Sequence, residues 1–210
     1  MPDTTNDRKL AIAIHGGSGI VTRSEMSAER EAAIRAALEA SVRAGHRALQ
    51  DGASAVEAVR AAIRVMEDSP LFNAGRGAVF NAEGKNELDA SIMEGKSLNA
   101  GAVAAVHNVR NPILLARKVM TDSAHVMLMG EGAETFAREQ GIAFENDDYF
   151  HTEYRWQQLQ KARASDRPDA TFLSETPDQW FSTVGAVALD RDGNLAAATS
   201  TGGMTNKQWG

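Results

Sequence analysis

Cysteine is absent from the 210-residue sequence. Disulfides, thiolate metal ligands and cysteine nucleophiles are therefore excluded, and threonine and serine remain as candidate nucleophiles. No window approaches the roughly 18 consecutive apolar residues of a membrane-spanning helix, so we expect no membrane span. Aromatic residues make up only 6% of the chain, which favours a core of small aliphatic side chains.

Basic residues are in the minority. The chain has 22 Lys and Arg against 28 Asp and Glu, for a net charge of −6, and its cations are scattered singly. Nucleic-acid binding draws on clustered cations that release counterions, so we expect no DNA or RNA partner. The start, MPDTTNDRKLAIAIHGG, places two acids before a very short apolar stretch, unlike a signal peptide. We expect a cytoplasmic protein.

The order of predicted elements points to a fold class. A chain of this length suits one domain with a sizeable core. We predict helices over 27–49, 53–67, 111–120 and 131–140, and strands over 10–14, 78–80, 87–93, 100–107 and 125–129. Strands and helices come in groups and do not alternate strictly. This favours an α+β fold with sheets and helices in separate layers, and an αββα four-layer sandwich fits.

A linker and a hairpin close the chain. Residues 162–182 contain two prolines, mixed charges and no sustained periodicity, so we predict an exposed linker. A β-hairpin follows, with strands over 183–189 and 195–200 and Asp-Gly in its turn. We therefore divide the chain into a region 1–182 and a region that starts at 183.

Thr183 lies where the predicted linker meets a buried strand. If the chain is cut before Thr183, its hydroxyl lies beside a free α-amine, whose pKa of about 7.7–8.0 lets it act as a general base. The alternative is that Thr183 is simply one more β-branched residue in a strand. The run Thr199-Ser200-Thr201-Gly202-Gly203 ends the partner strand with three hydroxyls and two glycines. It is either part of the same site or a polar strand end with a glycine turn.

Residues 183–207, TVGAVALDRDGNLAAATSTGGMTNK, resemble the nucleophile hairpin of plant-type asparaginases, also called isoaspartyl peptidases, of the N-terminal nucleophile hydrolase superfamily. Distant segments are similar to the same family. They are IHGGSG at 14–19, SPLFNAGRGAVF at 69–80, ELDASIM at 87–93, AGAVAAV at 100–106, RNPILLARKVM at 110–120 and HVMLMGEGAETFA at 125–137. The resemblance runs from about residue 9 to 210 and leaves only the linker unmatched.

The resemblance implies an αββα sandwich that cleaves itself between Ser182 and Thr183 into α and β chains. It also implies hydrolysis of L-asparagine or of β-aspartyl dipeptides at the side-chain amide carbonyl, and assembly as a dimer of αβ units. Carried over to this sequence, Thr183 is the nucleophile, and Thr201 holds its hydroxyl and its amine. Asn73 matches a polar residue near the nucleophile, although an asparagine in this loop could instead cap a turn.

The same resemblance assigns roles to two loops. Gly16 and Gly17 match the family's mobile glycine loop, whereas a phosphate-binding G-x-G-x-x-G loop would need glycine where Thr22 stands. Loop 66–76 matches a structural sodium site built from backbone carbonyl oxygens, which suit a hard cation. The residues implied are Met66, Glu67, Ser69, Phe72, Ala74 and Arg76.

The histidines do not strengthen a metal site. They lack the close spacing of a metal-binding pair, and histidines at strand ends are commonly structural. We assign no catalytic role to His15, His107, His125 and His151.

Two departures from the family pattern affect the expected activity. Ser182 stands where glycine is common, and a strained peptide costs serine about 1–3 kcal/mol more than it costs glycine, so we predict slow but real cleavage.

The sequence stops at NKQWG where the family continues with RVGDSP and the substrate-binding part. We therefore expect either a fragment of a longer precursor or a truncated product that cannot turn over substrate. The rival hypothesis is a non-catalytic, unprocessed remnant that only associates with partner chains. A glycosylasparaginase-like activity is disfavoured by the missing signal peptide and cysteines.

Overall fold

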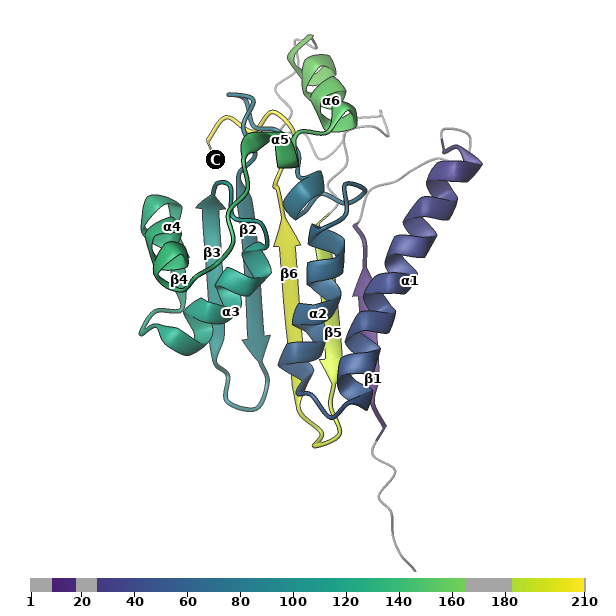
Figure 1. The fold of residues 1–210 in the computed structure, drawn as a ribbon, viewed down its shortest axis with the longest axis vertical. Helices are drawn as coiled ribbons and strands as arrows, with labels where there is room; N and C mark the ends of the chain where they lie inside the picture. Colours follow the sequence, from purple (N-terminus) through teal and green to yellow (C-terminus); the bar gives the residue numbers. More distant parts are fainter. Residues whose placement is uncertain (1–8, 18–25, 165–182, 210) are drawn as a thin grey trace, which may run out of the picture.

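The computed structural model describes residues 9–17, 26–164 and 183–209, and within these ranges the strands form one six-stranded sheet (Figure 1). The order across the sheet is β1-β5-β6-β2-β3-β4. All neighbours are antiparallel except β3 and β4, which are parallel. The strands are β1 (Ala11–His15), β2 (Leu88–Glu94), β3 (Ala100–Val106), β4 (Met127–Met129), β5 (Val184–Leu189) and β6 (Leu195–Thr201).

Three helices lie over one face of this sheet (Figure 1). Helix α2 (Ala55–Glu67) packs on β5 and β6, α3 (Pro112–Asp122) packs on β2 and β3, and α1 (Ala28–Gln50) packs on α2 and β1. The remaining helices are η1 (Gly75–Gly77), α4 (Gly130–Glu139), α5 (Asp147–Phe150) and α6 (Glu153–Ala164). Among the helices of the described ranges, none combines the length and the apolar character needed to cross a membrane.

Helix α2 shows how the sequence specifies this layer. Ser54 caps its N-terminus, because the serine hydroxyl accepts a hydrogen bond from the backbone N–H of Glu57. Val59 and Ile63 recur at helical spacing and are fully buried against the sheet. Burial of each such side chain stabilises the fold by about 1.5–3 kcal/mol. The helix that packs directly behind the hairpin is thus fixed by local capping and by one apolar face.

The second face of the sheet carries large apolar side chains that, in the described part of the chain, are exposed. Met93, Val187 and Leu195 are 42%, 53% and 59% exposed, whereas Ala186 and Ala198 on the helical face are buried. The arrangement confirms the α+β class and supplies one helical layer and one sheet of the expected αββα sandwich. An exposed apolar sheet face of this kind suits packing against a further layer.

Residues 78–80 do not form the strand that their apolar character predicts. The backbone groups that a strand would pair are occupied by side chains. The N–H of Val79 donates to Asn73 Oδ1, and the amide of Asn86 donates to the carbonyls of Ala78 and Val79. The segment is therefore an ordered loop braced by two asparagines.

The predicted linker begins too early. Ala162 is buried and belongs to the last turn of α6, so the helix continues to Ala164. Leu159 and Ala162 are three residues apart on the buried side of this helix. The rest of the predicted linker, residues 165–182, lies outside the described residues.

The hairpin turn between β5 and β6 is organised by Asp190. Its carboxylate accepts hydrogen bonds from the backbone N–H groups of Asp192 and Asn194, at 3.0 and 2.9 Å, and from that of Ala55 at the start of α2, at 3.1 Å. Burial raises the pKa of Asp190, but these hydrogen bonds outweigh it and bring the pKa below its ordinary value. One side chain thus ties the hairpin to the helix behind it.

Asp190→Ala is expected to lower the free energy of unfolding by about 1–3 kcal/mol at pH 7, because it leaves the buried N–H of Ala55 and two N–H groups of the turn without their acceptor. A depressed folded-state pKa stabilises the protein above the ordinary aspartate value of about 3.9, and this contribution is lost as the pH falls through the folded-state pKa. Urea unfolding across this pH range measures the effect. Asp192→Ala, which removes an exposed acid in the same turn, is the control, and an equal loss in both variants would contradict the role of Asp190.

Candidate active site

Thr183 directly precedes β5, at the end of the sheet where β5 begins and β6 finishes. The pairing of Val184 with Ser200 brings Thr183 beside Thr201. The hydroxyl of Thr183 donates to Thr201 Oγ1 at 3.0 Å, and the backbone N–H of Gly203 donates to the same oxygen at 3.0 Å. The side chains of Thr183 and Thr201, eighteen residues apart in sequence, are therefore in direct contact.

Asn73 lies against the same turn and is only 1% exposed. Its amide nitrogen donates to the carbonyl of Gly203 at 2.7 Å, and its Oδ1 accepts from the N–H of Val79 at 3.0 Å. A Cβ on Gly202 would lie 2.6 Å from Asn73 Oδ1, so glycine is required for this close approach. Asn73 thus braces its own loop and also holds the turn that follows Thr201.

The glycine loop begins at the end of β1, one strand away from Thr183. His15 pairs with Gly185 across the two strands, and a Cβ at residue 185 would overlap the His15 ring. Gly16 lies under Phe72, whose ring carbon would be 2.8 Å from a Cβ at residue 16. Gly17 has a φ of 131°, which favours glycine. Gly16 and Gly17 therefore lie at the same end of the strands as Thr183. Ser182 lies outside the described residues.

Loop 66–76 begins at the C-terminal end of α2. In the described ranges no three His, Cys, Asp or Glu side chains come together as a metal-binding group, so a cation here would depend on carbonyl oxygens. The carbonyls of Met66, Phe72 and Ala74 each accept one backbone hydrogen bond, at 3.0–3.2 Å, which leaves each a second lone pair. The carbonyl end of a helix also carries partial negative charge. These carbonyl oxygens are of the donor type that a hard cation accepts.

The side chain of Glu67 is a feature of the site that sequence reasoning missed. The residue is fully buried. Burial raises the pKa of its carboxyl to about 8, although hydrogen bonds from Ser200 and Ile113 act to lower it. Its place four residues after Ile63 on the apolar face of α2 is a detectable signal. An acid at such a position is buried and must find partners.

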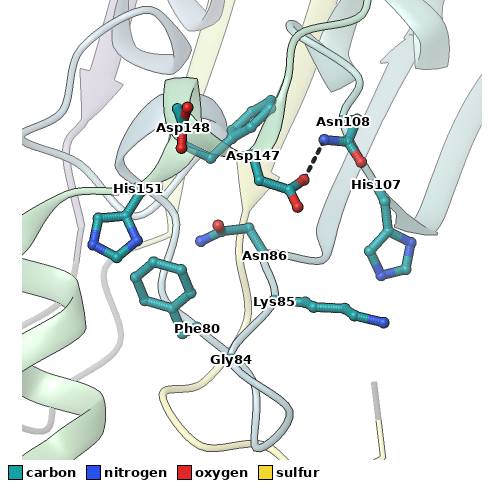
Figure 2. Close-up of a pocket in the computed structure, with 10 residues that line it drawn as sticks. Phe80, Gly84, Lys85, Asn86, His107, Asn108, Asp147, Asp148 and His151 are labelled. Atoms are coloured by element: carbon teal, nitrogen blue, oxygen red, sulfur yellow. Dashed lines mark hydrogen bonds between the residues drawn. The ribbon is translucent and has the colours of Figure 1, made fainter.

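A separate cavity of about 280 Å³ lies near the N-terminal end of β2, between α5 and the loops around residues 84 and 107 (Figure 2). Asn86 projects into it between His151 and His107, and Asn108 donates to Asp147 Oδ1 at 2.7 Å. The residues expected to carry chemistry do not line this cavity. It is connected to their site through Asn86, whose amide donates to the carbonyls of Ala78 and Val79 in the loop that also contacts Asn73.

Comparison with known proteins identifies the family. A family model for asparaginases matches residues 8–210. The chain is 50% identical to an isoaspartyl peptidase from Escherichia coli (strain K12) over 95% of the chain and 63% of that relative. It is 43% identical to an isoaspartyl peptidase/L-asparaginase from Xenopus laevis over 96% of the chain and 62% of that relative. A plant-type L-asparaginase from Pyrococcus furiosus is 42% identical over 96% of the chain and 66% of its own length.

The chain spans a little less than two thirds of the length of these relatives. The match nevertheless extends over nearly all of this chain, and it includes the hairpin, the glycine loop and the loop with Asn73. The resemblance found in the sequence is thereby confirmed, and the chain belongs to the asparaginase family of plant-type L-asparaginases and isoaspartyl peptidases.

Proposed function

We propose that the chain carries the nucleophile of an autoproteolytic threonine amidohydrolase. The protein would hydrolyse L-asparagine to L-aspartate and ammonia, and β-aspartyl dipeptides to aspartate and a free amino acid. The observation that carries this proposal is the 3.0 Å hydrogen bond from the Thr183 hydroxyl to Thr201, at the residue directly before the buried strand β5. The names of the relatives, isoaspartyl peptidase and L-asparaginase, support the choice of substrates.

Self-cleavage comes first in this proposal. The hydroxyl oxygen of Thr183 attacks the carbonyl carbon of Ser182, and the bond to the Thr183 nitrogen breaks as an ester bond forms. The nitrogen takes up the proton that the hydroxyl gives up. Water then hydrolyses the ester and leaves a carboxylate on Ser182 and a free amine on Thr183.

Turnover uses the new amine. Its ordinary pKa of about 7.7–8.0 lets it accept the hydroxyl proton near neutral pH. The Thr183 oxygen then attacks the side-chain amide carbonyl of the substrate, and the departing ammonia or amino acid takes the proton. Water hydrolyses the resulting acyl ester to release aspartate. Thr201 holds the hydroxyl in place, and Asn73 holds the turn beside it.

The strand order supports survival of the fold after cleavage. Strands β5 and β6 follow the cut, yet they lie between β1 and β2 of the region before it. Each is hydrogen-bonded to one strand of the first region. The division at residue 183 therefore separates two chains that stay within one sheet.

We further propose a structural sodium ion at loop 66–76, held by the carbonyl oxygens of the six residues named above. The free lone pairs of this loop and its position at the carbonyl end of α2 support the ion. It would fix the loop that carries Asn73. Dimerisation of αβ units and a cytoplasmic location stay predictions of the sequence.

The purified protein is expected to release ammonia from L-asparagine and leucine from β-aspartyl-leucine after cleavage has occurred. α-Aspartyl-leucine is the matched control, because its scissile amide is on the main-chain carbonyl, and we expect no release from it. A cleaved protein that acts on neither side-chain amide would contradict the proposed activity. An uncleaved and inactive protein would favour the non-catalytic remnant.

A further inference from the structure

The carboxyl group of Glu67, the last residue of α2, is buried behind the nucleophile hairpin. Its Oε1 accepts a hydrogen bond from the Ser200 hydroxyl at 2.6 Å and another from the N–H of Ile113 at 3.0 Å. Among the described residues, Oε2 has no hydrogen-bond partner. One oxygen therefore joins three elements, the end of α2, the start of α3 and the middle of the sheet.

Ser200 links the Glu67 carboxyl to the strand position beside the nucleophile. It is 1% exposed and faces the helices, and because side chains alternate along a strand, Thr201 faces the other way. Ser200 is also the strand partner of Val184, the residue after Thr183. The hydrogen bond to Glu67 thus fixes β6, from the helical side of the sheet, at the residue next to Thr201. The hydroxyl oxygen of Thr201 accepts the hydrogen bond from Thr183.

The backbone of Glu67 also meets the loop with Asn73. A Cβ on Gly75 would lie 2.5 Å from the Glu67 carbonyl oxygen, and Gly75 has a φ of +50°. The loop therefore closes directly on Glu67 at Gly75, the first residue of η1. The same residue touches both supports of the site, the strand that carries Thr201 and the loop that carries Asn73.

We propose that Glu67 is a positioning residue for Thr183, which acts through Ser200 to fix Thr201 in its hydrogen-bonding position. This role rests on the proposed function, because it concerns the geometry of the nucleophile in self-cleavage and hydrolysis. This role of the Glu67 side chain is separate from the role proposed for the Glu67 backbone carbonyl in the sodium loop. The side-chain oxygen is what the role requires, so a variant that keeps an acceptor there retains the function.

Four variants test the side chain. Ser200→Ala removes the donor, Glu67→Met removes the acceptor at similar volume, and the double variant removes both. Glu67→Gln keeps an acceptor oxygen for Ser200 and Ile113. The control is Ser41→Ala, because Ser41 is also fully buried and its hydroxyl donates to a carbonyl of α2, that of Ala62, at 2.8 Å.

The first readout is the rate of self-cleavage before Thr183. We expect Ser200→Ala and Glu67→Met each to slow it by about tenfold or more, which corresponds to loss of one buried hydrogen bond. The double variant should be no slower than the slower single variant, because both remove the same contact. Glu67→Gln and Ser41→Ala should stay within about threefold of the parent. Equal slowing in Ser41→Ala, or additive slowing in the double variant, would overturn the proposal.

The second readout does not need cleavage. The Thr201 γ-methyl signal in a methyl NMR spectrum should shift in Ser200→Ala and in Glu67→Met but not in Ser41→Ala. A parent protein that never cleaves would contradict the proposed function, and the methyl signal alone would then decide the role of Glu67. An unchanged Thr201 signal in both site variants would overturn that role even if the parent cleaves.

Discussion

Thr183→Ala is expected to remain a single uncleaved chain and to show no turnover of L-asparagine or β-aspartyl-leucine. Both steps require the hydroxyl oxygen of Thr183, first against the Ser182 carbonyl and then against the substrate. The amine that acts as general base also appears only after cleavage. The expected loss is therefore complete within detection, and the small side-chain change should leave the sheet folded.

Denaturing gel electrophoresis follows cleavage, and an assay for released ammonia follows turnover. Thr183→Ser is the matched variant, because it keeps the hydroxyl and loses only a methyl group, and it should cleave at a measurable rate. Turnover that persists in Thr183→Ala would rule out Thr183 as the nucleophile. Cleavage that persists in the same variant would assign the cut to another group.

Thr201→Val is expected to slow self-cleavage by about 10- to 100-fold. Valine has nearly the same shape and suits a strand, but it removes the oxygen that accepts from the Thr183 hydroxyl and from the N–H of Gly203. Two neutral hydrogen bonds together contribute about 1–3 kcal/mol, and each 1.4 kcal/mol of this that is lost from the transition state of cleavage is about a factor of ten in rate. The Thr183 hydroxyl then loses its fixed orientation.

Thr199→Val is the control for this substitution. Thr199 lies two residues earlier on the same face of β6, and its hydroxyl shares a 2.9 Å hydrogen bond with Ser91. The change is chemically identical, but it leaves Thr183 and Gly203 with their partners. Time courses of intact mass for both variants give the rates. Equal rates in Thr201→Val and the parent chain would show that Thr201 does not orient the nucleophile.

The hairpin could be predicted from the sequence because its pairing is local. The Asp-Gly turn and the two short apolar runs place β5 beside β6 without reference to the rest of the chain. The apolar face of α2 was predictable for the same reason. The position of Thr183 between the predicted linker and a strand suggested a nucleophile, but the choice of that role, and the roles of Thr201 and Asn73, came from family resemblance, since isolated threonines and asparagines have ordinary structural explanations.

The parts that the sequence did not reveal depend on distant contacts. Residues 78–80 have strand-like composition, but Asn73 and Asn86 occupy their backbone groups. Ser200 and Glu67 are 133 residues apart, so no local pattern shows that they form a pair. The pairing of β6 with β2 is equally non-local, and the position of the hairpin in the middle of the sheet follows from it.

The central claim is that Thr183 becomes a free N-terminal residue. Intact mass spectrometry with N-terminal sequencing, applied after prolonged incubation of the purified chain, tests it most directly. The account predicts two fragments, one that ends at Ser182 and one that begins with Thr183-Val184-Gly185. A single unchanged mass, or a new N-terminus at any other residue, would contradict it.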